Sequence, residues 1–112
     1  MNKILEIAGK AIDEIKGLDI IAYDFHEVNP FIDYVIICSA SNLRQVYALA
    51  DNVVDRIQEA GLYVRQMEGG KESRWILVDL DTVIVHVFYE EERQVYQLEK
   101  LYADLPQVAL NL

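Results

Sequence analysis

Apolar residues at the start of the chain recur every three or four positions, with lysines and acidic residues between them. This spacing predicts an amphipathic helix over residues 2–16, and Gly17 provides its end. Two short runs rich in β-branched and aromatic residues come next, Asp19–Phe25 and Asp33–Cys38, and Asn29-Pro30 marks a turn between them. Such runs predict two strands, both substantially buried.

A long helical pattern occupies the middle of the chain. The apolar residues between Ser41 and Gly61 fall on one face of a helix over about four turns. A serine side chain is a favourable N-terminal cap, so Ser39 or Ser41 is expected to cap this helix.

Three further strands are predicted after this helix. Tyr63–Met67 fits a short strand, and a turn-rich loop follows it. Trp75–Asp79 and Val83–Tyr89 then fit a strand pair joined by Leu80-Asp81-Thr82. Side chains alternate between the two faces of a strand, so His86 is expected to share a face with its second neighbours on each side, with valines on the other face.

The end of the chain predicts a helix and a tail. Three glutamates, at 90 to 92, lie where a helix N-terminus favours negative charge. The apolar stripe of that helix is expected to continue to Pro106 through Val95, Leu98, Leu101 and Tyr102. Residues 106–112 are expected to form a loosely held C-terminal tail.

These elements predict a single domain over residues 1–105 with a mixed α/β (α+β) fold. Its sheet would have about five strands and would be flanked by helices. The long middle helix would serve as a crossover between two parallel strands, with a right-handed connection.

Charge and composition narrow the classes of function that the protein could have. Of the 112 residues, 10 are Lys or Arg and 19 are Asp or Glu, which gives a formal net charge of -9. This excess of acidic residues argues against a protein that binds DNA or RNA through the phosphates, and it favours a basic partner. No signal peptide or membrane span is evident, and Cys38 is alone, so a reducing cytoplasmic location is expected.

Two short motifs raise the alternative of a metal-dependent nucleotidyltransferase. Asp79 and Asp81 are two positions apart in an extended segment and could hold a divalent cation. Ser39-Ala40-Ser41 could present backbone N–H groups to a phosphate. In that enzyme family, however, the acids follow a Gly-Ser turn closely, whereas here the acid pair lies about forty positions downstream and the turn lacks the glycine. A strand end and a helix cap explain both motifs more simply.

The strand pair offers a second candidate site. Ile84, His86 and Phe88, together with Trp75 on the neighbouring strand, would form an exposed aromatic patch if no helix covered that face. Such patches are typical of partner surfaces. A lone histidine on an apolar face is more often structural than catalytic, and too few histidines and cysteines are present for a zinc site.

The chain resembles the ribosome silencing factors, also called Iojap-like proteins. The matching stretches run in the expected order along nearly the whole chain, and the segment from Trp75 to His86 is the specific part. They are DYVIIC at 33–38, SNLRQV at 41–46, ADNVV at 50–54, EG at 68–69, WILVDL at 75–80, VIVHVF at 83–88 and RQVYQLEKLY at 93–102. One departure is that Asp79-Leu80-Asp81-Thr82 stands where the family commonly has Asp-x-Gly-Asp.

The resemblance implies a fold similar to that of nucleotidyltransferases without their catalytic acids, and therefore no enzymatic activity and no cofactor. It implies binding to the large ribosomal subunit through ribosomal protein L-fourteen, which blocks association with the small subunit and represses translation when nutrients are scarce. Carried over residue by residue, the partner surface would comprise Trp75, Asp79, Leu80, Asp81, His86, Phe88 and Arg93.

Within that surface, Trp75, Leu80 and Phe88 would be apolar anchors, and the two aspartates would meet basic residues of the partner. The alternatives for two members stay open, since Trp75 could belong to the core and Arg93 could pair with Glu90 or Glu99. A third hypothesis is a homodimer formed through the exposed face of the strand pair.

Overall fold

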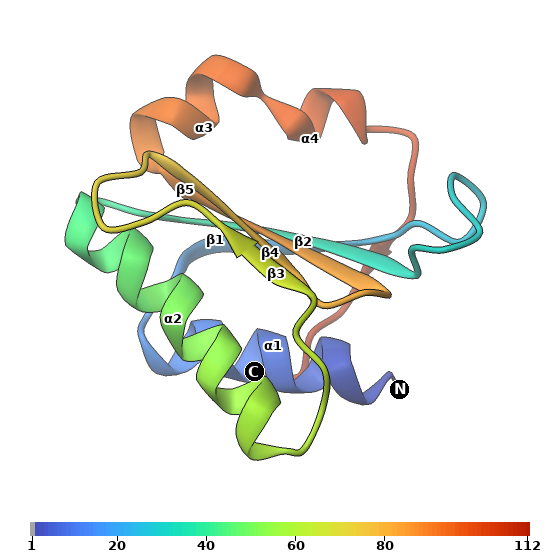
Figure 1. Ribbon diagram of the computed structural model, residues 1–112. Coiled ribbons are helices and arrows are strands. Elements are labelled where there is room, and N and C mark those ends of the chain that lie inside the picture. The colour runs from blue at the N-terminus through green and yellow to red at the C-terminus, as the bar shows by residue number, and fades with distance from the viewer. Residues whose placement is uncertain (1) are drawn as a thin grey trace.

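The protein, described here by a computed structural model for residues 2–112, is built around one mixed sheet with helices on both faces (Figure 1). The sheet order is β3-β4-β5-β2-β1-β6. In chain order the elements are α1 (Lys3–Glu14), β1 (Leu18–Asp24), β2 (Tyr34–Ala40), α2 (Leu43–Glu59), β3 (Gln66–Glu68), β4 (Trp75–Asp79), β5 (Val83–Tyr89), α3 (Glu90–Tyr96), α4 (Leu98–Leu101) and β6 (Gln107–Val108).

The predicted α/β class is confirmed, and the predicted parallel pair is found at the centre of the sheet. β2 and β5 pair in parallel, with Ile37 opposite His86, and α2 lies in the connection between them. The other strand pairs, including the β4–β5 hairpin, are antiparallel. The third predicted strand is shorter than expected and begins at Gln66, not at Tyr63.

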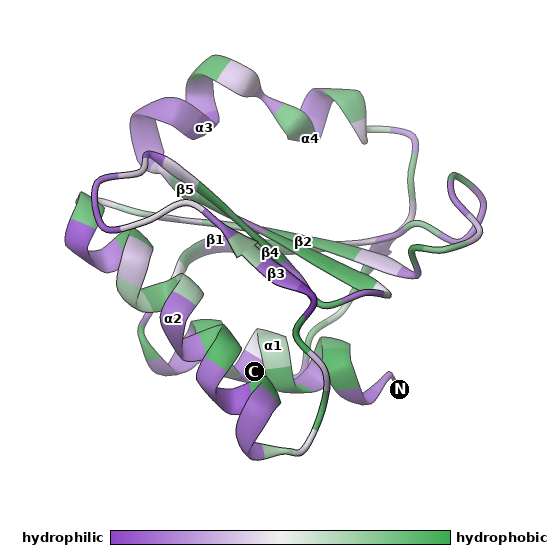
Figure 2. Ribbon diagram, in the orientation of Figure 1, coloured by the Kyte–Doolittle hydropathy of each residue, from purple (hydrophilic) through white to green (hydrophobic). Residues whose placement is uncertain are grey.

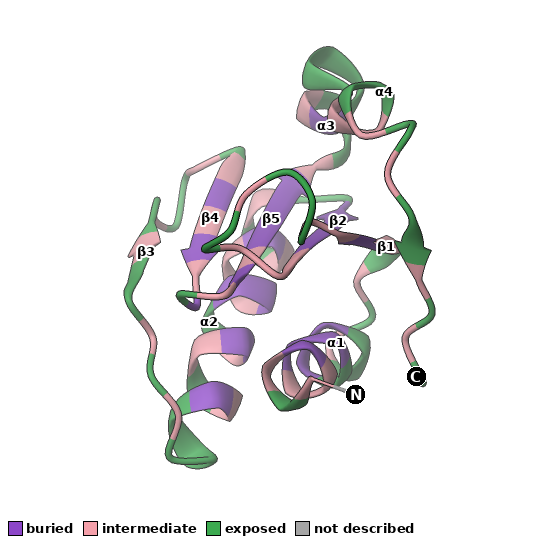
Figure 3. Ribbon diagram, turned by 90° about the vertical axis from the view of Figure 1, so that its right-hand side faces the viewer, coloured by how far each residue is buried: buried purple, intermediate pink, exposed green. Residues whose placement is uncertain are grey.

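The two faces of the sheet are covered unequally. α1 and α2 lie on one face and α3 and α4 on the other (Figure 1). Coloured by hydropathy, α1 and α2 are banded, as amphipathic helices are (Figure 2). Their apolar side chains and the inward residues of the strands form the larger buried cluster. Most residues of α3 and α4 are exposed or only half-buried (Figure 3).

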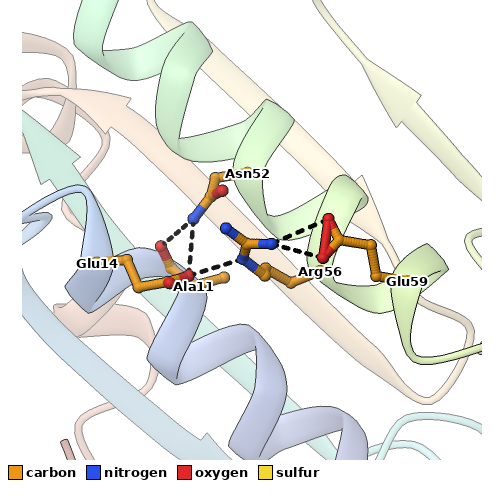
Figure 4. Close-up of polar contacts among 5 residues, drawn as sticks. All are labelled: Ala11, Glu14, Asn52, Arg56 and Glu59. Carbon is orange, nitrogen blue, oxygen red and sulfur yellow. Dashed lines mark hydrogen bonds and ion pairs between the residues drawn. The ribbon is translucent and has the colours of Figure 1, made fainter.

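α1 and α2 are also joined by a polar network (Figure 4). Asn52 Nδ2 donates to the carbonyl oxygen of Ala11 at 2.8 Å, and Arg56 Nε donates to Glu14 Oε1 at 2.9 Å. The arginine hydrogen bond lowers the pKa of Glu14. These groups are largely exposed, so the network fixes the orientation of the helices more than it adds to stability.

The cap of α2 differs from the prediction. Asn42 is the capping residue, and its Oδ1 accepts a hydrogen bond from the backbone N–H of Gln45 at 2.8 Å. Ser41 precedes the cap, and Ser39 is a buried residue of β2. The expected serine cap is therefore wrong, because asparagine, an equally good capping residue, stands immediately before the first helical residue.

The C-terminal helix is interrupted, contrary to the prediction. Gln97 has φ 50°, in the left-handed region, and it separates α3 from α4. Leu98 and Tyr102 still pack on the sheet as the stripe predicted. The break turns the other two members of the stripe away from it, so Val95 is 71% exposed and Leu101 is 75% exposed.

The segment after Pro106 is not a loose tail. Gln107 and Val108 pair with Tyr23 and Ala22 of β1, which makes β6 the sixth strand where about five were expected. Leu110 also packs against the larger cluster. Within residues 2–112 no helix combines the length and apolar character that a membrane crossing requires.

Candidate partner-binding surface

The β4–β5 hairpin places its side chains on two distinct faces. Directly opposite pairs are Trp75 with Phe88, Leu77 with His86, and Asp79 with Ile84, so these six residues share one face. The residues between them on the two strands point to the other face and are fully buried beneath α1 and α2; they are Ile76, Val78, Val85 and Val87. The alternation predicted around His86 is therefore confirmed.

α3 and α4 cover only part of the face that carries Trp75. Beneath them lies the smaller buried cluster, comprising Tyr23, Val35, Ile37 and Phe88. Towards the sheet edge formed by β3 and β4, Trp75, Leu77 and Ile84 are only half-buried. We refer to Trp75, Leu77, Ile84 and the neighbouring Tyr96 as the hairpin surface.

Aromatic stacking fixes the centre of the hairpin surface. The Trp75 ring lies 4.8 Å from the Phe88 ring at an interplanar angle of 27°. Tyr96, which is 52% exposed, lies over Trp75 with a centroid distance of 4.8 Å. Trp75 is therefore neither fully in the core nor free. It contacts both a buried ring of the sheet and an exposed ring of α3, and these two rings also lie 6.4 Å from each other.

His86 lies beneath this stack and is 8% exposed. The Trp75 Nε1–H donates to His86 Nδ1 at 3.1 Å, which requires the neutral imidazole with its proton on Nε2. Burial lowers the pKa of His86 to about 4. The side chain therefore contributes to the surface by supporting Trp75, and it offers little area of its own.

The turn between β4 and β5 carries the two aspartates. Asp79 Oδ1 accepts the backbone N–H of Asp81 at 2.9 Å, and Asp81 has φ 75°. Arg65 Nε lies 3.9 Å from Asp79 Oδ2, and Arg65 Nη1 lies 3.9 Å from Asp81 Oδ1. The two carboxylates therefore face the same side, as their spacing predicts. Among the described residues no cluster of three or more His, Cys, Asp or Glu could hold a metal ion.

Two predicted anchors are inaccessible. Leu80 is fully buried in the larger cluster, because the tight turn directs its side chain under the sheet while the aspartates on either side remain outside. Phe88 is fully buried beneath α3 and α4. Neither Leu80 nor Phe88 therefore offers exposed surface for the predicted anchor role, and Phe88 instead supports the Trp75 ring.

Arg93 is likewise structural, with 8% of its surface exposed. Its guanidinium donates to the carbonyl oxygens of Leu18 and Asp19 at 3.3 and 2.8 Å, and to Ser39 Oγ at 3.0 Å. Its Nε lies 3.4 Å from Glu99 Oε1, which is the pairing that the sequence had left open. The guanidinium of Arg93 is therefore occupied within the fold, and little of it is exposed to a partner.

Sequence reasoning missed Leu77 and Tyr96. Leu77 could have been found, because it lies two residues from both Trp75 and Asp79 on a strand and must share their face. Tyr96 had no comparable signal, since its position over Trp75 depends on how α3 packs against the sheet.

Comparison with known proteins identifies the family. The family model described as "Ribosomal silencing factor during starvation" matches residues 1–112. The chain is 44% identical to ribosomal silencing factor RsfS of Bacillus subtilis, over 98% of this chain and 93% of that protein. It is similar to a crystal structure from Bacillus halodurans (TM-score 0.85, 35% identity, 96% of this chain and 98% of that one). A crystal structure from Chromobacterium violaceum is similar too (TM-score 0.86, 33% identity, 100% and 94%). The resemblance found in the sequence is thereby confirmed, and the chain belongs to the ribosomal silencing factor family.

Proposed function

We propose that this chain is a non-enzymatic repressor of translation that acts in the cytoplasm when nutrients are limiting. It binds the large ribosomal subunit through ribosomal protein L-fourteen and blocks association with the small subunit by steric exclusion. The observation that carries the proposal is the hairpin surface, an apolar and aromatic area bordered by the acidic turn, in a member of a family named for ribosome silencing.

The charge of the protein supports a protein partner over ribosomal RNA. A chain with a formal net charge of -9 is repelled by phosphates, so it would dock where a basic protein is exposed. Asp79 and Asp81 lie next to the hairpin surface and could meet lysines or arginines there. The same surface could be covered by a second copy, and we propose a homodimer for the free protein.

The direct test mixes the purified protein with separated ribosomal subunits. The protein should pellet with the large subunit and should inhibit joining with the small one. Magnesium-dependent turnover of a nucleoside triphosphate, lost on Asp79→Asn, would instead favour the nucleotidyltransferase alternative.

Trp75→Ala is expected to weaken large-subunit binding by about 2 kcal/mol or more, which is about 30-fold in affinity, because buried interface tryptophans are frequent hot spots. Co-sedimentation across a range of protein concentrations measures this change. Tyr63→Ala is the matched control, since Tyr63 is an exposed aromatic residue of the segment between α2 and β3. That segment leaves the end of α2 that lies away from the sheet, on the side opposite α3 (Figure 1).

Folding of the Trp75 variant must be checked separately, because Trp75 packs on buried Phe88. The variant's urea midpoint and circular dichroism provide that check. Tyr96→Ala removes an exposed ring of the same surface with less risk to the fold. If both variants fold and pellet as the wild type does, the hairpin surface is not the docking site.

Replacing both turn aspartates by asparagine should weaken docking most at low salt, because screening reduces the lost attraction. Asparagine at 79 can still accept the Asp81 backbone N–H, so the turn is retained. The control is Asp51→Asn with Asp55→Asn, which removes two exposed charges from α2 on the other face of the sheet. Equal binding by both double variants through a salt series argues against an electrostatic role for the turn.

A further inference from the structure

We propose that His86 is a positioning residue that fixes the indole of Trp75 for docking, and that the docking pocket contacts this indole without hydrogen bonding to it. This proposal rests on the proposed function of the hairpin surface. His86 itself has too little exposed surface to be a major contact, since it is 8% exposed.

The geometry around Trp75 leaves one polar group to be satisfied. An indole has a single hydrogen-bond donor and no acceptor. In this protein that donor points into the sheet, where His86 Nδ1 accepts it at 3.1 Å. A partner therefore encounters a ring with no free polar group, and it can recognise the ring only by apolar contact or by a cation over its face.

Stacking by itself would not select this orientation. Phe88, stacked at 4.8 Å and 27°, holds the plane of the Trp75 ring, and Tyr96 packs against it at 4.8 Å with a tilt of 51°. Such apolar ring contacts are equally compatible with the Trp75 ring turned over. Turning the ring over would move Nε1 away from His86 and leave a half-buried donor without a partner, which is unfavourable. The imidazole thus distinguishes between two orientations that the stack permits.

The position of His86 on a central strand holds its imidazole acceptor in a fixed place. Its neighbours across the strands are Leu77 on β4 and Ile37 on β2, and it lies at the centre of the sheet. Neither neighbour competes for Nδ1. An acceptor held on a central strand positions a surface ring more accurately than one on a loop.

The experiment exploits the fact that the chain contains one tryptophan. Its indole N–H gives a single amide-type resonance, whose hydrogen-exchange rate reports the hydrogen bond in the free protein. Time-resolved fluorescence anisotropy of the same side chain reports its nanosecond mobility. Neither measurement needs the ribosome.

Two variants separate the hydrogen bond from ring packing. His86→Asn keeps an acceptor at the same number of bonds from Cβ and removes the ring. His86→Phe keeps a ring of similar shape and removes the acceptor. We expect the indole N–H to exchange at least about ten-fold faster in His86→Phe than in wild type, and large-subunit affinity to fall about five-fold, the range of one net hydrogen bond. His86→Asn should retain most of the protection and affinity.

An unprotected indole N–H in the wild type would overturn the proposal without any variant. So would a His86→Phe variant that matches the wild type in exchange and binding, or a pair in which Phe preserves docking and Asn abolishes it. If the wild type does not pellet with large subunits, the proposed function fails, while the exchange rates still decide whether His86 positions Trp75.

Discussion

Arg93→Met should lower the free energy of unfolding by about 3–5 kcal/mol, although Arg93 was first expected to lie on the partner surface. Its guanidinium supplies the donors for Leu18 and Asp19 carbonyl oxygens and for Ser39 Oγ. The register of β1 against β2 is irregular between Leu18 and Ile21, which explains why these oxygens need a partner from outside the strand pair. Methionine fills part of the space but leaves the Asp19 carbonyl oxygen without this donor and leaves Leu18 only the long hydrogen bond from Ser39 Oγ at 3.4 Å. It also removes the ion-pair partner of the buried Glu99 Oε1, which has no hydrogen bond of its own.

Urea unfolding provides the measurement for Arg93→Met, with the midpoint shifted and the slope unchanged. Arg65→Met is the matched control, because Arg65 is exposed and its ion pairs are long, so its loss should cost less than about 1 kcal/mol. Arg93→Lys should fall between these values, since an ammonium cannot span three acceptors at once. Equal midpoints for the Arg93 and Arg65 variants would contradict the structural role.

The second large effect is expected from pH. His86 has its pKa lowered to about 4 by burial, whereas in the unfolded chain it returns to about 6.5. Between these values the unfolded state binds a proton that the folded state does not, so stability decreases as the pH falls. The shift corresponds to a loss of about 3 kcal/mol between pH 7 and pH 4.

A comparison with His86→Phe isolates this contribution. The other histidine, His26, behaves in the opposite sense, because the hydrogen bond to Asp24 at 2.6 Å raises its pKa, and its stabilising effect is lost as the pH rises. The wild type and His86→Phe both retain His26 and the carboxylates, so the difference between their pH profiles belongs to His86. Urea midpoints should fall more steeply with acid in the wild type, and parallel profiles would show that His86 titrates normally.

Acid should affect docking through the same side chain. Protonation of His86 places a hydrogen on Nδ1, which then cannot accept from Trp75. The indole N–H should therefore remain protected at neutral pH and lose protection near pH 4.

Much of the fold could be predicted from the pattern of apolar residues. The bounds of β4 and β5 agree with the sequence prediction, and α1, α2, β1 and β2 agree within a few residues. These elements have a clear periodicity, and each buries one face or both. β6 was not predicted, because two residues paired at a sheet edge leave no periodic signal.

The candidate site was only partly predictable. Trp75 and His86 were identified, and the structure shows them hydrogen-bonded to each other. The contacts of Arg93 within the fold were not predicted, because its acceptors at Leu18 and Asp19 lie more than 70 residues away in the chain. No local pattern distinguishes an arginine that reaches across the fold from one in solvent.

By itself, the sequence determined the family, the fold class, the acidic character and the two faces of the β4–β5 hairpin, because these depend on composition, motif order and a two-residue period. Only the tertiary structure decided which part of the outer face is accessible. The two-residue period predicts that Phe88 and Trp75 share a face. The left-handed residue Gln97 and the packing of α3 and α4 determine that Phe88 is covered and that Trp75 stays partly exposed.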